Sequence, residues 1–265
     1  PMSIYTMGID VGSTASKCVI LKDGSEIVAK SLVPVGTGTT GPARAIAQVL
    51  EDANMTREQM DFVLATGYGR NSLDGLADMQ MSELSCHAKG AAFLFPNVRT
   101  VVDIGGQDVK GISIDTDGTV KNFAMNDKCA AGTGRFYEAM ARSFEMSLPE
   151  FSNLSLTAKN VIPITAQCTV FAESEVITLV GEGKPMDEIA AGIELSVAKR
   201  CFVMAKKAGA VDKITLTGGC AKNEGLKQAI QKVLKLKVID LPVDPQLIGA
   251  IGAAEFARQK GLAQG

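Results

Sequence analysis

The chain has 265 residues, of which 46% are hydrophobic and 21% are charged, and its formal net charge is −2. This is the composition of a globular protein with enough apolar residues for one large core or two smaller ones. The near-neutral charge, the absence of Trp and the scarcity of Tyr argue against a nucleic-acid partner. No apolar run reaches the ~20 residues that span a bilayer, so the sequence also predicts no membrane partner.

Residues 7–24 (MGIDVGSTASKCVILKDG) form the first motif: a β-rich run, a glycine-bearing tight turn, a second β-rich run and an Asp-Gly turn. Residues 100–118 (TVVDIGGQDVKGISIDTDG) repeat this pattern. Both copies contain Asp-x-Gly, four further residues and Lys: Asp10, Gly12 and Lys17 in the first, Asp103, Gly105 and Lys110 in the second. Two copies in equivalent positions predict a duplicated domain with halves 1–96 and 97–265.

Hydrophobic periodicity and breaker residues predict the remaining elements. In chain order the predicted helices span 42–53, 82–94, 132 to about 146, 169 onwards, 186 to about 208, 222 onwards and 246 onwards. Further strands are predicted at 213–217 and 237–241, the first of them closed by Gly218-Gly219. Strands followed by alternating helices predict an α/β architecture in each half.

The turn of the first hairpin suits phosphate binding, because its backbone N–H groups point inward and a glycine lets oxygens approach closely. Ser13 and Thr14 add hydroxyl donors, and Lys17 is long enough to reach a phosphate. The predicted phosphate-binding residues of this turn are Gly12, Ser13, Thr14, Ala15, Ser16 and Lys17. A single copy would be read as a plain tight hairpin; the duplication and the third Gly-Gly turn favour a nucleotide site.

The second hairpin and two further segments complete the predicted nucleotide site. Asp10 and Asp103 are expected to face each other and to hold magnesium through waters, with Asp108 as a further candidate ligand. Gln107 is a candidate for orienting a hydrolytic water, or alternatively only satisfies backbone groups of the turn. The remaining residues predicted to bind ATP or ADP are Gly105, Gly106, Gly218 and Gly219, the last two beside the adenine, and Gln246.

The three glycine-bearing elements, in this order, resemble the phosphate-1, phosphate-2 and adenosine motifs of the actin, Hsp70 and sugar-kinase superfamily. The resemblance covers the whole chain. It implies two ribonuclease-H-like (actin-like ATPase) domains with a nucleotide cleft between them.

The chain contains six cysteines: Cys18, Cys86, Cys129, Cys168, Cys201 and Cys220. The first residues lack the basic-then-apolar pattern of a secretion signal, so we expect a cytoplasmic protein with reduced thiols. Cys129 and Cys168 each precede a predicted helix, whose N-terminus lowers a thiol pKa and stabilises an anionic centre. Their spacing alone leaves metal ligation, packing and a redox pair open, and a two-fold dimer would supply four thiolates.

Several segments resemble the activators (component A) of 2-hydroxyacyl-CoA dehydratases. The matching stretches are GIDVGSTASK, ATGYGR at 65–70, SELSCHA at 82–88, DIGGQD at 103–108, MNDKCAAGTGRF at 125–136 and CTVFAESEVI at 168–177. The resemblance implies one 4Fe–4S cluster per homodimer, held by Cys129 and Cys168 of both subunits. It further implies an ATP-dependent electron transfer from reduced ferredoxin or flavodoxin to the dehydratase (component D).

Other readings of the sequence remain open. ATPase subunits of benzoyl-CoA reductase share the same motifs. A small-molecule kinase on this fold would need no iron, and neither would an ATP-switched binding protein whose cysteines are core residues. Glu173 and Glu175 follow Cys168 closely, and we expect them to complement the helix dipole.

Overall fold

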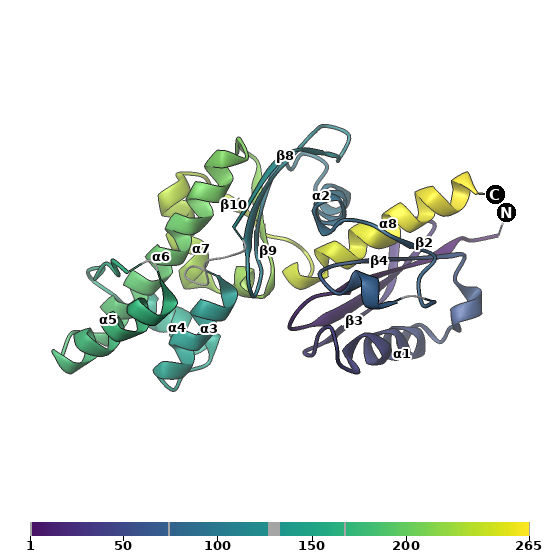
Figure 1. The fold of residues 1–265 in the computed structure, drawn as a ribbon. Coiled ribbons are helices and arrows are strands. Elements are labelled where there is room, and N and C mark those ends of the chain that lie inside the picture. The colour runs from purple at the N-terminus through teal and green to yellow at the C-terminus, as the bar shows by residue number, and fades with distance from the viewer. Residues whose placement is uncertain (1, 74, 127–132, 167, 265) are drawn as a thin grey trace. The chain divides into compact units, whose positions relative to one another are not determined.

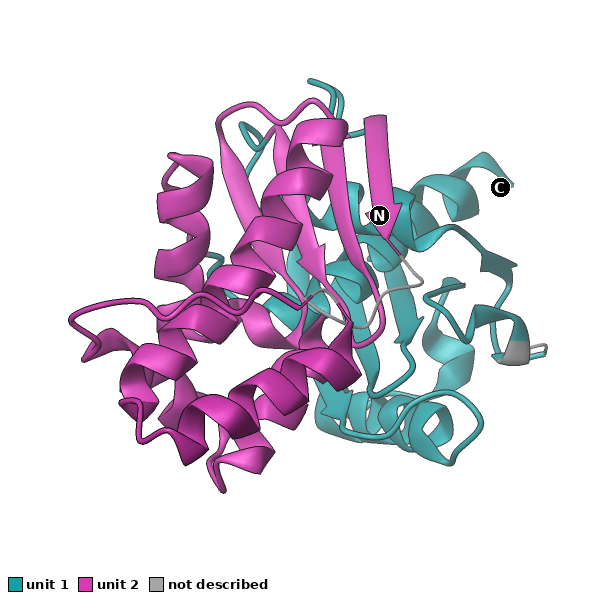
Figure 2. Ribbon diagram, turned by 60° about the vertical axis from the view of Figure 1, so that its left-hand side comes forward, with its two compact units in different colours: residues 1–98, 114–120, 241–265 teal, residues 99–113, 121–240 magenta. Residues whose placement is uncertain are grey.

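The computed structural model describes residues 2–73, 75–126, 133–166 and 168–264. The chain divides into two compact units, shown in teal and magenta in Figure 2. Unit 1 comprises residues 1–98, 114–120 and 241–265, and unit 2 comprises residues 99–113 and 121–240. Each unit is built on a five-stranded sheet, so the α/β class predicted from the sequence is confirmed.

The sheet of unit 1 has the strand order β3-β2-β1-β4-β5. Its strands are β1 (Tyr5–Val11), β2 (Ser16–Lys22), β3 (Glu26–Val33), β4 (Phe62–Thr66) and β5 (Met79–Gln80). The first hairpin pairs β1 and β2 antiparallel, with Asp10 opposite Lys17. Strand β4 pairs parallel to β1 and places Thr66 opposite Asp10. The pairing therefore surrounds one buried carboxylate with a lysine on one side and a threonine on the other.

Helices cover both faces of this sheet (Figure 1). Helix α1 (Gly41–Ala53) packs on one face with Ala45 and Val49, against the alternate side chains of Met7 and Ile9. Helices α2 (Glu83–Leu94) and α8 (Ile248–Ala263) lie against each other, and α8 packs on β1 and β4. The period-two alternation of β1 explains the two faces, because Gly8 between Met7 and Ile9 points toward α8.

The C-terminal segment belongs to unit 1, whereas the sequence-based division placed residues 241–265 in the second half. The reason is a close approach of backbones that only glycine permits. A Cβ at Gly252 would overlap the carbonyl oxygen of Cys86 in α2, and a Cβ at Gly8 would overlap that of Ala250 in α8. These contacts join positions far apart in the sequence, which hydrophobic periodicity does not reveal.

The sheet of unit 2 repeats this arrangement, with the strand order β10-β9-β6-β7-β8. Its strands are β6 (Thr100–Ile104), β7 (Val109–Ile114), β8 (Val120–Asn126), β9 (Ile214–Thr217) and β10 (Val238–Ile239). Asp103 lies opposite Lys110 in the antiparallel pair and opposite Thr217 in the parallel pair. The same three residue types thus meet at the same register in both units.

Helices α3 to α7 gather on one side of this second sheet (Figure 1). They are α3 (Gly134–Ser143), α4 (Leu148–Leu156), α5 (Thr169–Gly181), α6 (Met186–Lys207) and α7 (Glu224–Leu234). Their core is formed by large side chains such as Phe136, Phe151, Ile189 and Ile193. Helix α4 was not predicted, although Ser147 caps it by accepting from the Glu150 amide.

The other helices agree with the sequence to within a few residues. Helices α5 and α6 begin at Thr169 and Met186, where the sequence predicted them. Helix α7 begins two residues after Lys222 and α8 two residues after Gln246, because a 3-10 turn precedes each of them. Within the described ranges, no helix combines the length and apolarity needed to cross a membrane.

A buried carboxyl group lies inside unit 2. Glu194 of α6 is only 2% exposed, and the Tyr137 hydroxyl donates a hydrogen bond of 2.5 Å to its Oε1. Burial raises the pKa of Glu194 to about 7, although hydrogen bonds from Ser155 and Tyr137 oppose the change. The folded protein therefore retains this proton at a pH where the unfolded chain releases it.

We predict that replacing Gly252 by Ala lowers the free energy of unfolding by about 1–3 kcal/mol, because the added Cβ forces α2 and α8 apart. Thermal unfolding of Gly252→Ala and the parent measures this. Gly181→Ala is the matched control, since nothing lies within 4 Å of a Cβ at Gly181. Equal melting temperatures of Gly252→Ala and the control would contradict the packing described here.

A second prediction concerns pH. The folded-state pKa of Glu194 is raised, so its contribution to stability is complete below the ordinary value of 4.5 and is lost as pH rises through about 7. Across that window the parent should lose up to ~3 kcal/mol that Glu194→Gln does not lose. Denaturant unfolding at pH 5 and pH 8 measures the difference, with Glu182→Gln on the surface as the control. Identical pH slopes in parent and Glu194→Gln would refute it.

Candidate functional site

The first hairpin presents a buried ion pair beneath its turn. Asp10 is 4% exposed, and its Oδ2 lies 3.6 Å from Nζ of Lys17. The Gly12 amide donates to the Ala15 carbonyl at 2.9 Å and closes the turn. Thr14 is exposed in this turn. Of the residues predicted to bind phosphate, Gly12 to Ala15 form the turn, and Ser16 and Lys17 begin β2 beside Asp10.

Two glycines allow the backbone to lie in close contact with the Asp10 carboxylate. A Cβ at Gly249 would lie 2.6 Å from Asp10 Oδ2, and a Cβ at Gly67 would overlap Oδ1. Gly67 also has a φ of +96°, which strongly favours glycine. Gly249 lies in the first turn of α8, whose N-terminus stabilises a nearby negative charge. Neither residue was predicted as part of the site; Gly67 lies in the ATGYGR stretch, but no local signal marks Gly249.

The loop after β3 supports the same turn from the side. The Thr37 amide donates to the Gly12 carbonyl at 3.0 Å, and the Ser16 hydroxyl donates to the Val35 carbonyl at 2.8 Å. A Cβ at Gly36 would overlap the Gly12 carbonyl oxygen. Ser16, one of the predicted phosphate-binding residues, is fully buried. Its hydroxyl bonds the loop after β3 to the turn.

The second hairpin has an equivalent ion pair, Asp103 with Lys110, to which a second carboxylate is added. Nζ of Lys110 lies 3.7 Å from Asp103 Oδ2 and 3.0 Å from Asp108 Oδ2, so one lysine serves two carboxylates. The Thr217 hydroxyl donates to Asp103 Oδ1 at 2.7 Å. Gln107 is exposed in the turn. The structure therefore brings together the predicted Asp103, Asp108 and Lys110, and adds Thr217, which sequence reasoning missed.

The turn of the second hairpin is also hydrogen-bonded to the first residues of α3. The Gly134 amide donates to the Gly105 carbonyl at 2.9 Å, and the Arg135 amide donates to the Gly106 carbonyl at 3.1 Å. Thr133 caps the helix by accepting from the Phe136 amide. The segment just before this helix carries Cys129, which lies outside the described residues. The second hairpin is thus bonded to the helix that follows this cysteine.

The remaining predicted nucleotide residues lie in two short turns. Gly218 ends β9 with a φ of +94°, and a Cβ there would overlap the Ile104 carbonyl oxygen. Gly219 starts the 3-10 helix that follows. Gln246 lies in unit 1 in the turn before α8, where its amide donates to Asp244 Oδ1 at 2.9 Å. Unit 1 therefore holds Gln246 with the first hairpin, and unit 2 holds the Gly-Gly turn with the second.

The described cysteines fall into two classes. Four of them are buried, and burial raises the pKa of each to about 12: Cys18, Cys86, Cys201 and Cys220. These thiols stay protonated near neutral pH and are poor metal ligands. Cys168 is instead exposed and occupies the N-cap of α5. Among the described cysteines, Cys168 alone therefore fits a ligand role.

Two more observations bear on a metal group at Cys168. The neighbouring Thr169 Oγ1 is buried and has no hydrogen-bond partner among the described residues. Nowhere in the described ranges do three His, Cys, Asp or Glu side chains form a metal-binding group. A cluster shared by two copies needs only two thiolates from each chain, and the second predicted ligand, Cys129, lies outside these ranges.

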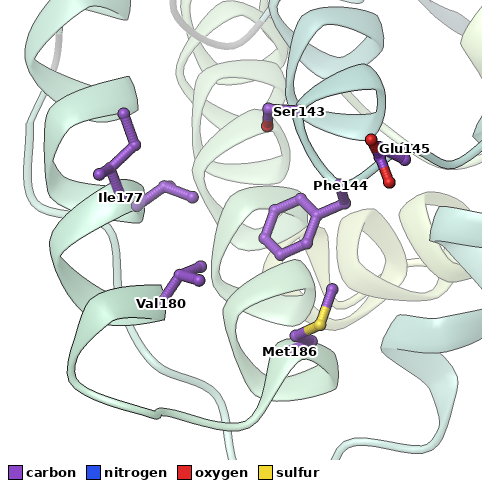
Figure 3. Close-up of a pocket in the computed structure, with 7 residues that line it drawn as sticks. Ser143, Phe144, Glu145, Ile177, Val180 and Met186 are labelled. Carbon is purple, nitrogen blue, oxygen red and sulfur yellow. The ribbon is translucent and has the colours of Figure 1, made fainter.

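An apolar hollow lies away from these residues. It has a volume of about 370 Å³ and is lined by Ser143, Phe144, Glu145, Val176, Ile177, Val180 and Met186. Figure 3 shows Phe144, Val180 and Met186 around it. None of its lining residues belongs to the predicted nucleotide or metal site. Nearer Cys168, the apolar side chains of Val170 and Phe171 are 66% and 69% exposed.

Known proteins resemble the chain along its length. The sequence profile of the BadF/BadG/BcrA/BcrD ATPase family matches residues 7–257. The (R)-2-hydroxyglutaryl-CoA dehydratase activating ATPase of Acidaminococcus fermentans is 56% identical, over 98% of this chain and 99% of that protein. The activator of lactoyl-CoA dehydratase from Anaerotignum propionicum is 51% identical, over 96% of this chain and 97% of that protein.

A solved structure agrees with these sequence matches. The activator of the 2-hydroxyisocaproyl-CoA dehydratase from Clostridium difficile, solved with bound ADPNP, matches with a TM-score of 0.93 and 46% identity. The match covers 98% of this chain and 97% of that chain. The resemblance to the dehydratase activators and the actin-like ATPase fold expected from the sequence are thereby confirmed.

Proposed function

Because the chain belongs to the BadF/BadG/BcrA/BcrD ATPase family, we propose that it hydrolyses ATP to deliver one electron to a 2-hydroxyacyl-CoA dehydratase. The observation that carries the electron-transfer part is the contrast between the exposed Cys168 at a helix N-terminus and the four buried, protonated cysteines. Relatives at 56% and 51% identity bear the names of activators of such dehydratases. The proposed partner is therefore a dehydratase of this class (component D).

Each residue of the nucleotide site has a proposed role. Asp10 and Asp103 hold magnesium through waters. Ser13, Thr14 and the backbone amides of the first turn donate to phosphate, together with Lys17. Gly105, Gly106 and Asp108 line the second phosphate turn. Gly218 and Gly219 adjoin the adenine. The remaining residues proposed to bind the nucleotide are Ala15, Ser16 and Gln246.

Hydrolysis requires a positioned water. We assign that role to Gln107, because it is exposed in the second turn and carries an amide that both donates and accepts. Asp108 is held by Lys110 at 3.0 Å and is less suited to act as a base. In this arrangement the chain supplies orientation and charge, which is most of what phosphoryl transfer needs.

The proposed cluster site uses Cys129 and Cys168 from each of two copies. When bound there, a 4Fe–4S cluster supplies a centre that stores and releases one electron. Cys168 lies at the N-terminus of α5, whose unpaired N–H groups suit an anionic cluster, and the exposed Val170 and Phe171 offer apolar surface for a protein contact. These features support a homodimer with the cluster on its two-fold axis.

A physical route connects the two sites within unit 2. The carbonyls of Gly105 and Gly106 accept from the first amides of α3, so a movement of the second turn on phosphate release moves the start of that helix. Cys129 precedes α3 by only a few residues. We propose that this contact couples ATP hydrolysis to the segment that carries Cys129.

The donor and the compartment complete the proposal. A low-potential protein carrier, reduced ferredoxin or flavodoxin, supplies the electron. We place the reaction in the cytoplasm, where thiols stay reduced.

We predict that Asp10→Asn and Asp103→Asn each lower ATPase activity by about 100-fold, because the amide removes the negative charge that holds the hydrated metal. Phosphate release with magnesium and ATP measures this. Asp52→Asn, an exposed aspartate on α1, is the matched control and keeps the parent activity. Full activity in both site variants would remove these carboxylates from the mechanism.

The cluster assignment predicts about four iron and four sulfide per two chains in protein purified without oxygen. Cys168→Ser should lose nearly all iron and still bind ADP, whereas Cys86→Ala, which changes a buried thiol, should retain the iron. Iron and acid-labile sulfide assays beside ADP titration measure this. An iron-free parent after proper reconstitution would refute the electron-transfer function and leave a phosphate-transferring kinase or a nucleotide-switched binding protein on this fold.

A further inference from the structure

Glu175 has a structural setting that the helix dipole does not explain. It lies in the second turn of α5, seven residues after Cys168, and its side chain turns back toward the segment that precedes the helix. Its Oε1 accepts from the Thr165 amide and the Thr165 hydroxyl, each at 3.0 Å. Its Oε2 accepts from the Ala166 amide at 3.0 Å. One carboxylate thus binds three donors from two consecutive residues.

These hydrogen bonds also favour the ionised form of the carboxylate. Partial burial acts to raise the pKa of Glu175, but the bonds from Thr165 and Ala166 outweigh it and hold the pKa below its usual value. The group is therefore ionised near neutral pH, and hydrogen bonds to an ionised acceptor are stronger than neutral ones. The contact is a charge-assisted clamp on the backbone.

The described residues on either side of Cys168 are both held by hydrogen bonds to α5. On one side of the cysteine, Ala166 is fixed to Glu175; on the other, the Cys168 carbonyl accepts from the Ala172 amide at 2.8 Å. Residues 161–166 belong to no helix or strand, and the bond from the Ile162 amide to the Glu188 carbonyl anchors their start. Glu175 is thus the anchor nearest to Cys168 on its N-terminal side among those described.

We infer that Glu175 is a positioning residue for Cys168: by fixing Thr165 and Ala166 to α5 it sets the direction in which the Cys168 thiol leaves the helix N-terminus. Its importance for the metal rests on the proposed function, whereas the clamp itself does not. Groups that hold a metal ligand in place affect metal retention strongly although they do not touch the metal.

The neighbouring Glu173 provides a matched control. It lies on the same helix and carries the same charge, but it is exposed and stands closer to the helix N-terminus. If the two glutamates only complemented the helix dipole, neutralising Glu173 would have the larger effect, because the dipole acts mainly on the first turn. The clamp predicts the opposite order.

Hydrogen exchange of iron-free protein tests the clamp. In Glu175→Gln the amide side chain has one acceptor oxygen and faces a backbone N–H with its own NH₂, so exchange over 165–172 should rise about 10-fold. Glu173→Gln should exchange like the parent. Thr165→Val removes only the hydroxyl donor and should give an intermediate rate. Unchanged ADP binding in all variants shows that the fold is retained.

Iron-loaded protein tests the consequence for the metal. Glu175→Gln should lose iron to a chelator about 10-fold faster than Glu173→Gln and should change the electron paramagnetic resonance spectrum of the reduced protein. Equal exchange rates in the two variants, or equal iron loss, would overturn the inference. A parent that never binds iron would instead refute the proposed function, and the exchange experiment would still decide whether the clamp exists.

Discussion

A buried carboxylate that faces a lysine across two antiparallel strands is the interaction on which both units depend. Asp10 and Lys17 lie 3.6 Å apart in unit 1, and Asp103 and Lys110 lie 3.7 Å apart in unit 2. Burying either charge alone would cost several kcal/mol, so each pair fixes the register of its hairpin: a slip by one residue would separate the partners. With the register fixed, the turn above each pair is held in one conformation.

The two hairpins differ in the residues that contact their buried carboxylates, Asp10 and Asp103. In unit 1, the backbone at Gly67 and Gly249 approaches the two carboxylate oxygens of Asp10 closely. In unit 2, Thr217 donates to Asp103 and Asp108 shares its lysine, so that aspartate is held by its neighbours. The two carboxylates are therefore equally buried but have different neighbours.

The sequence predicted features that depend on neighbouring residues and missed those that depend on distant ones. The duplicated hairpins and the start of α5 at Thr169 follow from local spacing, turn residues and helix signals. The placement of α8 in unit 1 and the role of Gly249 depend on contacts between residues that are far apart in the sequence, such as Gly8 with Ala250 and Gly249 with Asp10. Glu175 was assigned to the helix dipole because its true partners precede the helix, and a helical pattern does not show which way a side chain turns.

The absence of regular secondary structure in residues 161–166 explains why the segment before Cys168 needs a clamp. Residues 161–166 are neither strand nor helix, so sheet or helix hydrogen bonds do not hold them, and Ile164 and Ala166 are only partly buried against the core. A charged acceptor on the adjoining helix restrains such a segment without adding apolar surface next to the exposed Val170 and Phe171. A thiol presented in this way combines the access that a shared metal centre requires with the fixed geometry that its ligation requires.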